Sequence, residues 1–217
     1  MESVYLKLFV VFALLAGLRL ATFARFVPAR VRSTIAEYTD SGIIASVVAI
    51  FVVTFLLQIS RVEGISMAPT LHGGEYTLIN KLTYRWRVPE RGDVIVFRAP
   101  TDPHADYIKR VIAVAGETVQ VKEGVVYVNG NPLKESYEET APDYDYAMTT
   151  VPAGNLFVLG DNRNRSFDSH LWPAPFLPMG LVRGRASIVL WPPERMGAIK
   201  GTPIAGPATQ LPMNACR

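Results

Sequence analysis

Two apolar stretches stand at the start of the chain, and the second is the clearer one. Residues 41–60 (SGIIASVVAIFVVTFLLQIS) contain no charged side chain. A helix of this length rises about 30 Å, the thickness of the hydrocarbon core of a bilayer. A buried core helix is the alternative, but such a helix usually carries a polar stripe. The pattern therefore predicts a transmembrane helix over residues 41–60.

The first stretch, residues 4–24, is less regular because Lys7 and Arg19 interrupt it. It spans a membrane only if these two side chains extend to the two interfaces. A cleaved signal peptide is the second interpretation, although Arg19 and Arg25 lie where a small-residue cleavage site would follow. We favour a first transmembrane helix, so that one or two helices anchor the chain.

Basic residues around the link between the stretches predict the orientation. Four arginines lie there against two acidic residues: Arg19, Arg25, Arg30 and Arg32 against Glu37 and Asp40. Because segments rich in Lys and Arg stay on the cytoplasmic side, the residues after 60 are expected on the extracytoplasmic side. This holds whether one or both stretches span the membrane.

After Arg61 the pattern changes to short alternating runs separated by Gly and Pro. These runs are 77–80, 93–97, 107–114, 118–121, 125–128, 156–160 and 186–191. Most are rich in β-branched residues and bounded by turn formers, which is typical of an antiparallel sandwich or barrel. The fold class is therefore predicted as mainly β, with a membrane anchor over 1–60 and an antiparallel β-sheet domain over 61–197.

Two further segments are expected to be irregular. Residues 135–150 are acidic and polar, which favours an exposed loop, and residues 198–217 are expected to form a loose C-terminal tail.

Composition fits the predicted anchor and excludes several functions. Apolar residues make up 49% of the chain and charged residues 19%, against about 25% charged in an ordinary soluble domain. A net charge of +3 without a basic block gives no reason to expect nucleic acid. The single cysteine excludes an intrachain disulfide and a thiolate zinc cage.

No motif requires a metal or a cofactor, and we expect neither. The three histidines, His72, His104 and His170, are spread over about a hundred positions. A metal site assembled from His170, Asp161 and Asp168 is possible, but nothing in their spacing demands it.

Lys109 is the most unusual residue of the predicted strands. In DYIKRVIAV it shares a face with Tyr107 and Val111, while Arg110 points to the other face. One basic side chain therefore has apolar neighbours whichever face is inside. The alternative is an edge strand with solvated Lys and Arg. If Lys109 is buried, its pKa is lowered and its neutral amine is a competent general base.

A base of this kind needs a hydroxyl, and Ser66 is the best candidate. It lies six residues beyond the apolar stretch, in VEGISMAPTLHGGE, where Gly64 gives the backbone freedom and Pro69 stiffens the next residues. Such a turn can expose a serine together with its backbone N–H. A third motif, GDNRNRSFDSH from Gly160 to His170, comes after an apolar strand and suits either a polar loop or a scaffold that orients a base.

In this order behind a membrane helix, these motifs resemble type I signal peptidases, also called leader peptidases. GISMAPTL is similar to the nucleophile motif of that family, YIKRVIAVAGE to its general-base motif and GDNRNRSFDSH to its third signature. RGDVIVF and IVLWPPERMG also fit. The resemblance covers roughly residues 62–197 and the anchor.

The resemblance implies a role for each matching residue. Ser66 is then the nucleophile and Lys109 the general base of a Ser-Lys dyad, and Ser166 hydrogen-bonds and orients the lysine. The remaining matches are structural supports of the base region (Asp161, Asp168, His170) and flanks of the pockets for small residues (Val62, Met67, Ile108). The resemblance also implies partners: precursor proteins that carry signal peptides, cleaved after Ala-x-Ala-like sequences, and a lipid bilayer.

Two positions depart from the usual family pattern. Some members carry a serine that donates to the oxyanion where this chain has Gly64. The position of His170 is commonly arginine, and histidine there resembles cyanobacterial and plastid members. A tie between His170 and Asp168 depends on pH.

Two other functions are alternatives to a peptidase, and more than one kind of membrane fits the anchor. A Ser-Lys self-cleaving repressor shares the β fold but has a DNA-binding helical domain where this chain is hydrophobic. A catalytically degenerate, membrane-anchored β-domain binding module would lack Ser66, Lys109 or Ser166, and all three are present. We expect a bacterial plasma (inner) membrane, with a thylakoid or other organelle membrane as the alternative.

Overall fold

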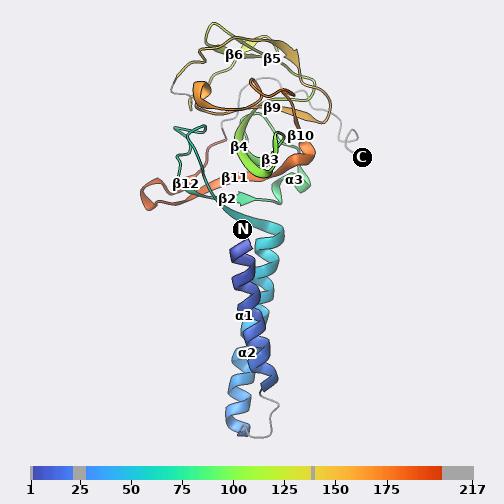
Figure 1. Ribbon diagram of the computed structural model, residues 1–217, viewed down its shortest axis with the longest axis vertical. Helices are drawn as coiled ribbons and strands as arrows, with labels where there is room; N and C mark the ends of the chain where they lie inside the picture. The colour runs from blue at the N-terminus through green and yellow to red at the C-terminus, as the bar shows by residue number, and fades with distance from the viewer. Residues whose placement is uncertain (1, 22–27, 138–139, 202–217) are drawn as a thin grey trace. The chain divides into compact units, whose positions relative to one another are not determined.

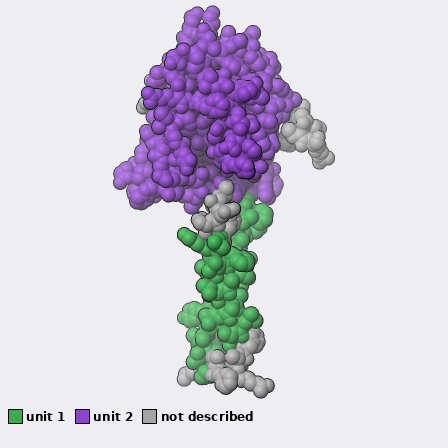
Figure 2. Space-filling view, viewed as in Figure 1, with its two compact units in different colours: residues 1–57 green, residues 58–217 purple. Residues whose placement is uncertain are grey.

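The chain folds into two compact units, residues 1–57 and 58–217 (Figure 2). The computed structural model describes residues 2–21, 28–137 and 140–201. The sequence prediction put the boundary between anchor and β domain at residue 60. Most of the predicted tail, residues 198–217, lies outside the described residues.

Unit 1 is a pair of helices that run side by side in opposite directions (Figure 1). α1 covers Glu2–Ala21, and α2 covers Ala29–Phe51 and continues as a π-helical turn, η1, Val52–Leu56. Close approach of the helices depends on a small residue, because a Cβ atom at Gly42 would lie 3.0 Å from Leu15.

The second helix is longer than the predicted segment 41–60, and it ends earlier. Residues Val31–Leu56 form a helical segment long and apolar enough to cross a membrane, and it is the one such segment within the described ranges. Residues Leu57–Arg61 are not helical but form strand β1 beside β2. The uncharged stretch therefore ends in a strand, whose backbone hydrogen bonds are made with β2. The apolar pattern alone does not distinguish such a strand from the end of a helix.

Unit 2 is built on a large antiparallel sheet in the order β1-β2-β11-β3-β4-β9-β10, with β12 beside β11. Its strands after β1 are β2 Tyr76–Asn80, β3 Val94–Ala99, β4 Asp102–Val114, β9 Asn155–Leu159, β10 Leu177–Pro178, β11 Val182–Trp191 and β12 Gly197–Ala198. The short helical turns are α3 Thr83–Trp86, η2 Arg163–Arg165, η3 Met179–Leu181 and η4 Pro193–Arg195.

A second, smaller sheet covers one part of the first (Figure 1). Its order is β7-β6-β5-β8, with bounds Asn131–Pro132, Val125–Val128, Thr118–Lys122 and Tyr146–Thr150. Valines of β5 and β6 pack with Phe157 and Leu159 of β9 in one buried cluster. The predicted class, a mainly antiparallel β fold behind an apolar helix, is confirmed.

Two segments predicted as irregular are partly ordered, so those predictions were wrong in part. Residues 146–150 of the predicted loop 135–150 form β8 and pair with β5. Glu135 of the same loop is bound by the buried Arg163 guanidinium, an attraction that composition cannot show. At the C-terminal side, β12 includes Ala198 and Ile199 is buried, so packing continues past the predicted boundary at residue 197.

Candidate active site

Lys109 lies in the interior of the large sheet. β4 is hydrogen-bonded to β3 on one side and to β9 on the other, so the alternative of an edge strand is wrong. The side chain is 4% exposed, and its Nζ lies 5.6 Å from the centre of the Tyr107 ring, on the predicted face. The register between β4 and β9 shifts between Val111 and Ala113. Lys109 and Val111 therefore share a face, but the alternation does not continue to Ala113.

The amine of Lys109 meets the hydroxyl of Ser66. Lys109 Nζ donates a hydrogen bond to Ser66 Oγ at 2.7 Å. Burial lowers the pKa of Lys109 to about 8, although the carboxylates of Asp168 and Asp161 act in the opposite direction. The sequence pattern could indicate only that one of two neighbouring basic residues faces apolar groups, whereas the structure buries both and joins Lys109 to a serine.

The turn that carries Ser66 lies between β1 and β2 and is fixed to the loop after β9. The Ser66 carbonyl accepts a hydrogen bond from the Asn162 backbone N–H at 3.0 Å, and Asn162 Nδ2 donates to the Ile65 carbonyl at 3.2 Å. Gly64 has φ of +80°, in the left-handed region that favours glycine. Within the described residues, the Ser66 N–H donates to no acceptor and is therefore available to a ligand.

Gly160 holds the serine turn and the third motif together, and sequence reasoning missed it. A Cβ atom at this position would overlap both the Ser66 carbonyl oxygen and the Ser166 side chain. Only glycine leaves room for the two serine segments to approach this closely. Its one sequence signal is a glycine at the end of an apolar strand, just before the polar motif.

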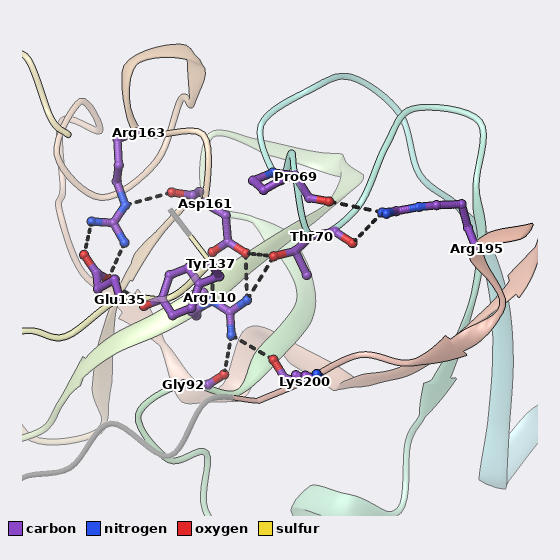
Figure 3. Close-up of polar contacts among 11 residues, drawn as sticks. Pro69, Thr70, Gly92, Arg110, Glu135, Tyr137, Asp161, Arg163, Arg195 and Lys200 are labelled. Atoms are coloured by element: carbon purple, nitrogen blue, oxygen red, sulfur yellow. Dashed lines mark hydrogen bonds and ion pairs between the residues drawn. The ribbon is translucent and has the colours of Figure 1, made fainter. Parts of the chain in front are cut away.

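Asp161 binds the neighbour of the lysine and not the lysine itself. Its carboxylate receives a two-pronged pair from Arg110, with Nε at 2.8 Å and Nη2 at 2.7 Å, and the Thr70 hydroxyl donates to the same carboxylate (Figure 3). The guanidinium of Arg110 lies 3.8 Å from the centre of the Tyr137 ring and is fully buried. Thr70, Arg110 and Tyr137 were not among the predicted site residues.

Asp168, by contrast, joins the two ends of the third motif. One of its oxygens accepts the Gly160 N–H at 2.8 Å, and the other lies 2.7 Å from His170 Nδ1. The His170 ring stacks on Tyr144 with a centroid distance of 3.9 Å. The predicted pairing of His170 with Asp168 is therefore present as a contact.

Ser166 is buried against Gly160, but its predicted hydrogen bond to Lys109 is not formed. Its Oγ has no hydrogen-bond partner among the described residues. The serine therefore lies beside the dyad with its hydroxyl unpaired, although it remains close to the Ser66 backbone on the other side of Gly160.

The predicted pocket residues share one apolar cluster. Val62 and Met67 are buried, and Ile108 packs against the same apolar cluster. In the described part of the chain, no three His, Cys, Asp or Glu side chains converge as metal ligands. Asp161 and Asp168 are instead occupied by Arg110 and His170.

A serine in contact with a buried lysine, as Ser66 and Lys109 are here, is one of the arrangements that serine hydrolases use. The model of the family "Signal peptidase, peptidase S26" matches residues 35–191, so the chain belongs to this family. This membership confirms the resemblance found in the sequence, and the chain is a serine endopeptidase of a family that processes signal peptides.

Relatives come from bacteria and from chloroplasts. The chain is 40% identical to Signal peptidase I of Leptolyngbya laminosa, over 72% of this chain and 80% of the relative. It is 33% identical to thylakoidal processing peptidase 1, chloroplastic, of Arabidopsis thaliana, over 76% of this chain and 51% of the relative. The chain also matches a crystal structure of a signal peptidase I from Enterococcus faecalis, with 32% sequence identity and a TM-score of 0.42. This match covers 46% of the present chain and 98% of the chain in that crystal structure.

Gly160→Ala tests the close approach of the two serine segments. The added methyl group would displace the Ser66 backbone, and a displacement of about 1 Å at a reacting group lowers kcat by about 100-fold. Gly197→Ala is the matched control, because a Cβ atom there meets nothing within 4 Å. Both variants would be assayed on a purified precursor protein, with circular dichroism to verify the fold. A Gly160→Ala protein with normal kcat would show that Ser66 does not depend on this contact.

Proposed function

We propose that the chain removes signal peptides from exported precursor proteins, with Ser66 as the nucleophile and Lys109 as the general base. The observation that supports this most strongly is the 2.7 Å hydrogen bond between Ser66 Oγ and a lysine amine that is 4% exposed. Burial lowers the pKa of Lys109 to about 8, which gives a usable fraction of neutral amine near neutral pH. A solvated lysine has a pKa of about 10.4 and would be almost entirely charged there.

The reaction is an acyl transfer in two steps. Neutral Lys109 accepts the Ser66 hydroxyl proton while Oγ attacks the scissile carbonyl carbon. The protonated amine then gives this proton to the leaving amine of the mature protein, and the signal peptide stays attached to Ser66 as an ester. Water attacks the ester with Lys109 again as base, releases the signal peptide and restores the serine.

The oxyanion that forms in each step needs a donor, and the Ser66 N–H is the nearest one in sequence. It has no acceptor among the described residues, so it is free to bind the developing charge. A donor of this kind contributes about 3–4 kcal/mol of transition-state stabilisation.

The residues around the dyad position it. Asp161 holds Arg110, the neighbour of Lys109 in β4, and Asp168 holds the Gly160 N–H and His170. We assign Asp161, Asp168 and His170 to support of the base region. Ser166 is assigned to orientation of Lys109, because its buried hydroxyl has no other hydrogen-bond partner among the described residues.

Cleavage follows small residues, in Ala-x-Ala-like sequences. The apolar cluster that contains Val62, Met67 and Ile108 is formed by residues next to both members of the dyad, since Met67 follows Ser66 and Ile108 precedes Lys109. A tightly packed apolar wall accepts a methyl group and excludes larger side chains.

The enzyme is anchored in a bilayer by α2, with the β unit on the extracytoplasmic side. The segment Val31–Leu56 has the length and apolar character of a membrane span. Arginines near the N-terminal end of this segment favour the cytoplasm for that end. The membrane is the plasma membrane of a bacterium, or a thylakoid membrane as the chloroplast relative suggests.

The dyad is tested by Ser66→Ala and Lys109→Ala in the full chain, purified in detergent. Each variant is expected to lower the rate of precursor cleavage by at least about 1,000-fold, because nucleophile and base act as a unit. Glu63→Gln, a change at an exposed residue of the same turn, is the control. Normal cleavage by Lys109→Ala would exclude the dyad.

A precursor with Leu in place of the small residue before the scissile bond should resist the unmodified enzyme.

The pH dependence of kcat/KM follows from the lysine. Only neutral Lys109 accepts the serine proton, so kcat/KM should rise about tenfold per pH unit below its pKa of about 8 and level off above it. Melting temperatures over the same pH range separate this effect from unfolding. A kcat/KM that stays constant across this range would contradict a lysine base.

Membrane topology is tested by protease accessibility in sealed cells or vesicles. A tag placed before Ala29 should be protected, whereas the β unit should be cut by protease added from the extracytoplasmic side. The opposite pattern would refute the orientation, even if the dyad results hold.

A further inference from the structure

The turn that carries Ser66 is held at its C-terminal side by an arginine from a distant part of the chain. Arg195 Nη2 donates to the carbonyl oxygens of Pro69 at 3.1 Å and Thr70 at 3.2 Å (Figure 3). No backbone N–H of the described residues reaches either carbonyl. Arg195 therefore supplies the hydrogen bonds that this part of the turn does not obtain from its own backbone.

The guanidinium is itself held in place by the end of the same turn. Arg195 Nε donates to Glu75 Oε1 at 2.8 Å, and Glu75 is 3% exposed. The Nη2 atom also lies 3.0 Å from His72 Nδ1. One planar side chain thus joins the middle of the turn to its end, which a lysine with a single charged atom cannot do with the same geometry.

Thr70 is hydrogen-bonded on two sides, and these bonds connect Arg195 to β4, the strand that carries Lys109. Its carbonyl accepts from Arg195, whereas its hydroxyl donates to Asp161 and lies 3.3 Å from Arg110 Nη2. Figure 3 shows Arg195 approaching Thr70 from the side opposite to Asp161 and Arg110. Arg110 follows Lys109 in β4. The contacts of Thr70 with Asp161 and Arg110 therefore fix the serine turn relative to the strand that carries the base.

We propose that Arg195 is a positioning residue for the nucleophile, which keeps the turn of residues 66–70 at the distance where Ser66 Oγ meets Lys109 Nζ. The inference rests on the proposed Ser-Lys function. Arg195 belongs to η4, after β11, and lies beyond residue 191, where the match to the family model ends. It does not touch the reacting atoms and acts through the backbone of the turn.

The surroundings of Arg195 make a chemical test possible. Its side chain is 42% exposed and borders a surface hollow of about 440 Å³ between residues 72–75 and Trp191–Pro192. A small planar cation in solution can enter this hollow when the side chain is truncated.

The experiment compares Arg195→Ala, Arg195→Lys and the matched control Glu194→Gln, an exposed neighbour in η4, in the full chain in detergent. Arg195→Ala is expected to lower kcat by about 10- to 100-fold with KM changed less than about twofold, since the nucleophile is displaced but the apolar pocket stays. Arg195→Lys should fall between Arg195→Ala and the unmodified protein. Millimolar guanidinium should restore part of the kcat of Arg195→Ala and leave Glu194→Gln unchanged.

The outcomes separate this inference from the proposed function. A normal kcat for Arg195→Ala overturns the positioning role, as does a loss that appears in KM alone. Should Arg195→Ala fail to fold by circular dichroism, Arg195→Lys decides, and an unmodified kcat in that variant also overturns the role. Failure of the Ser-Lys function itself appears elsewhere, as retained cleavage by Ser66→Ala or Lys109→Ala.

Discussion

The burial of one amine is the constraint on which the rest of unit 2 depends. Lys109 has no carboxylate within ion-pair distance among the described residues, and its amine contacts a neutral hydroxyl. Its pKa falls from 10.5 to about 8, which corresponds to a cost of about 3 kcal/mol for the charged form. Because the unfolded chain binds this proton more tightly, the free energy of unfolding rises with pH between about 8 and 10.5. The fold must supply this cost from its packing.

The charged groups next to Lys109 pair with one another, and none of the neighbouring carboxylates forms an ion pair with its amine. Arg110 takes Asp161 in a two-pronged pair and the Gly92 and Lys200 carbonyls as further acceptors. Asp168 is occupied by His170 and by the Gly160 N–H. Each carboxylate therefore has a closer partner than Lys109, and desolvation remains the dominant influence on its pKa.

Sequence patterns predicted most of the strands and proposed Ser66 and Lys109 as the reacting pair, but they did not predict the contacts that fix the distance between these two residues. Alternation indicated only that Lys109 or Arg110 faces apolar groups, and the resemblance of the ordered motifs to the family pointed to Ser66 and Lys109. The role of Gly160 depends on the close approach of the Ser66 and Ser166 segments, which are far apart in the sequence, and no local pattern encodes that distance. Thr70 and Arg195 are ordinary surface-type residues in sequence, and their importance arises only where β1, β9 and β11 bring their loops together. The β1 strand was hidden because an uncharged run suits a helix and a strand equally.

The lowered pKa of Lys109 also has a consequence for the compartment in which the β unit works. With a pKa of about 8, the neutral amine is the minor form at neutral pH and becomes scarcer as the pH falls. Membranes that pump protons outward, or into a lumen, acidify the side on which the proposed topology places this unit. If the proposed function holds, precursor maturation slows wherever that side becomes more acidic, so the pH of one compartment sets the rate of export processing through a single side chain.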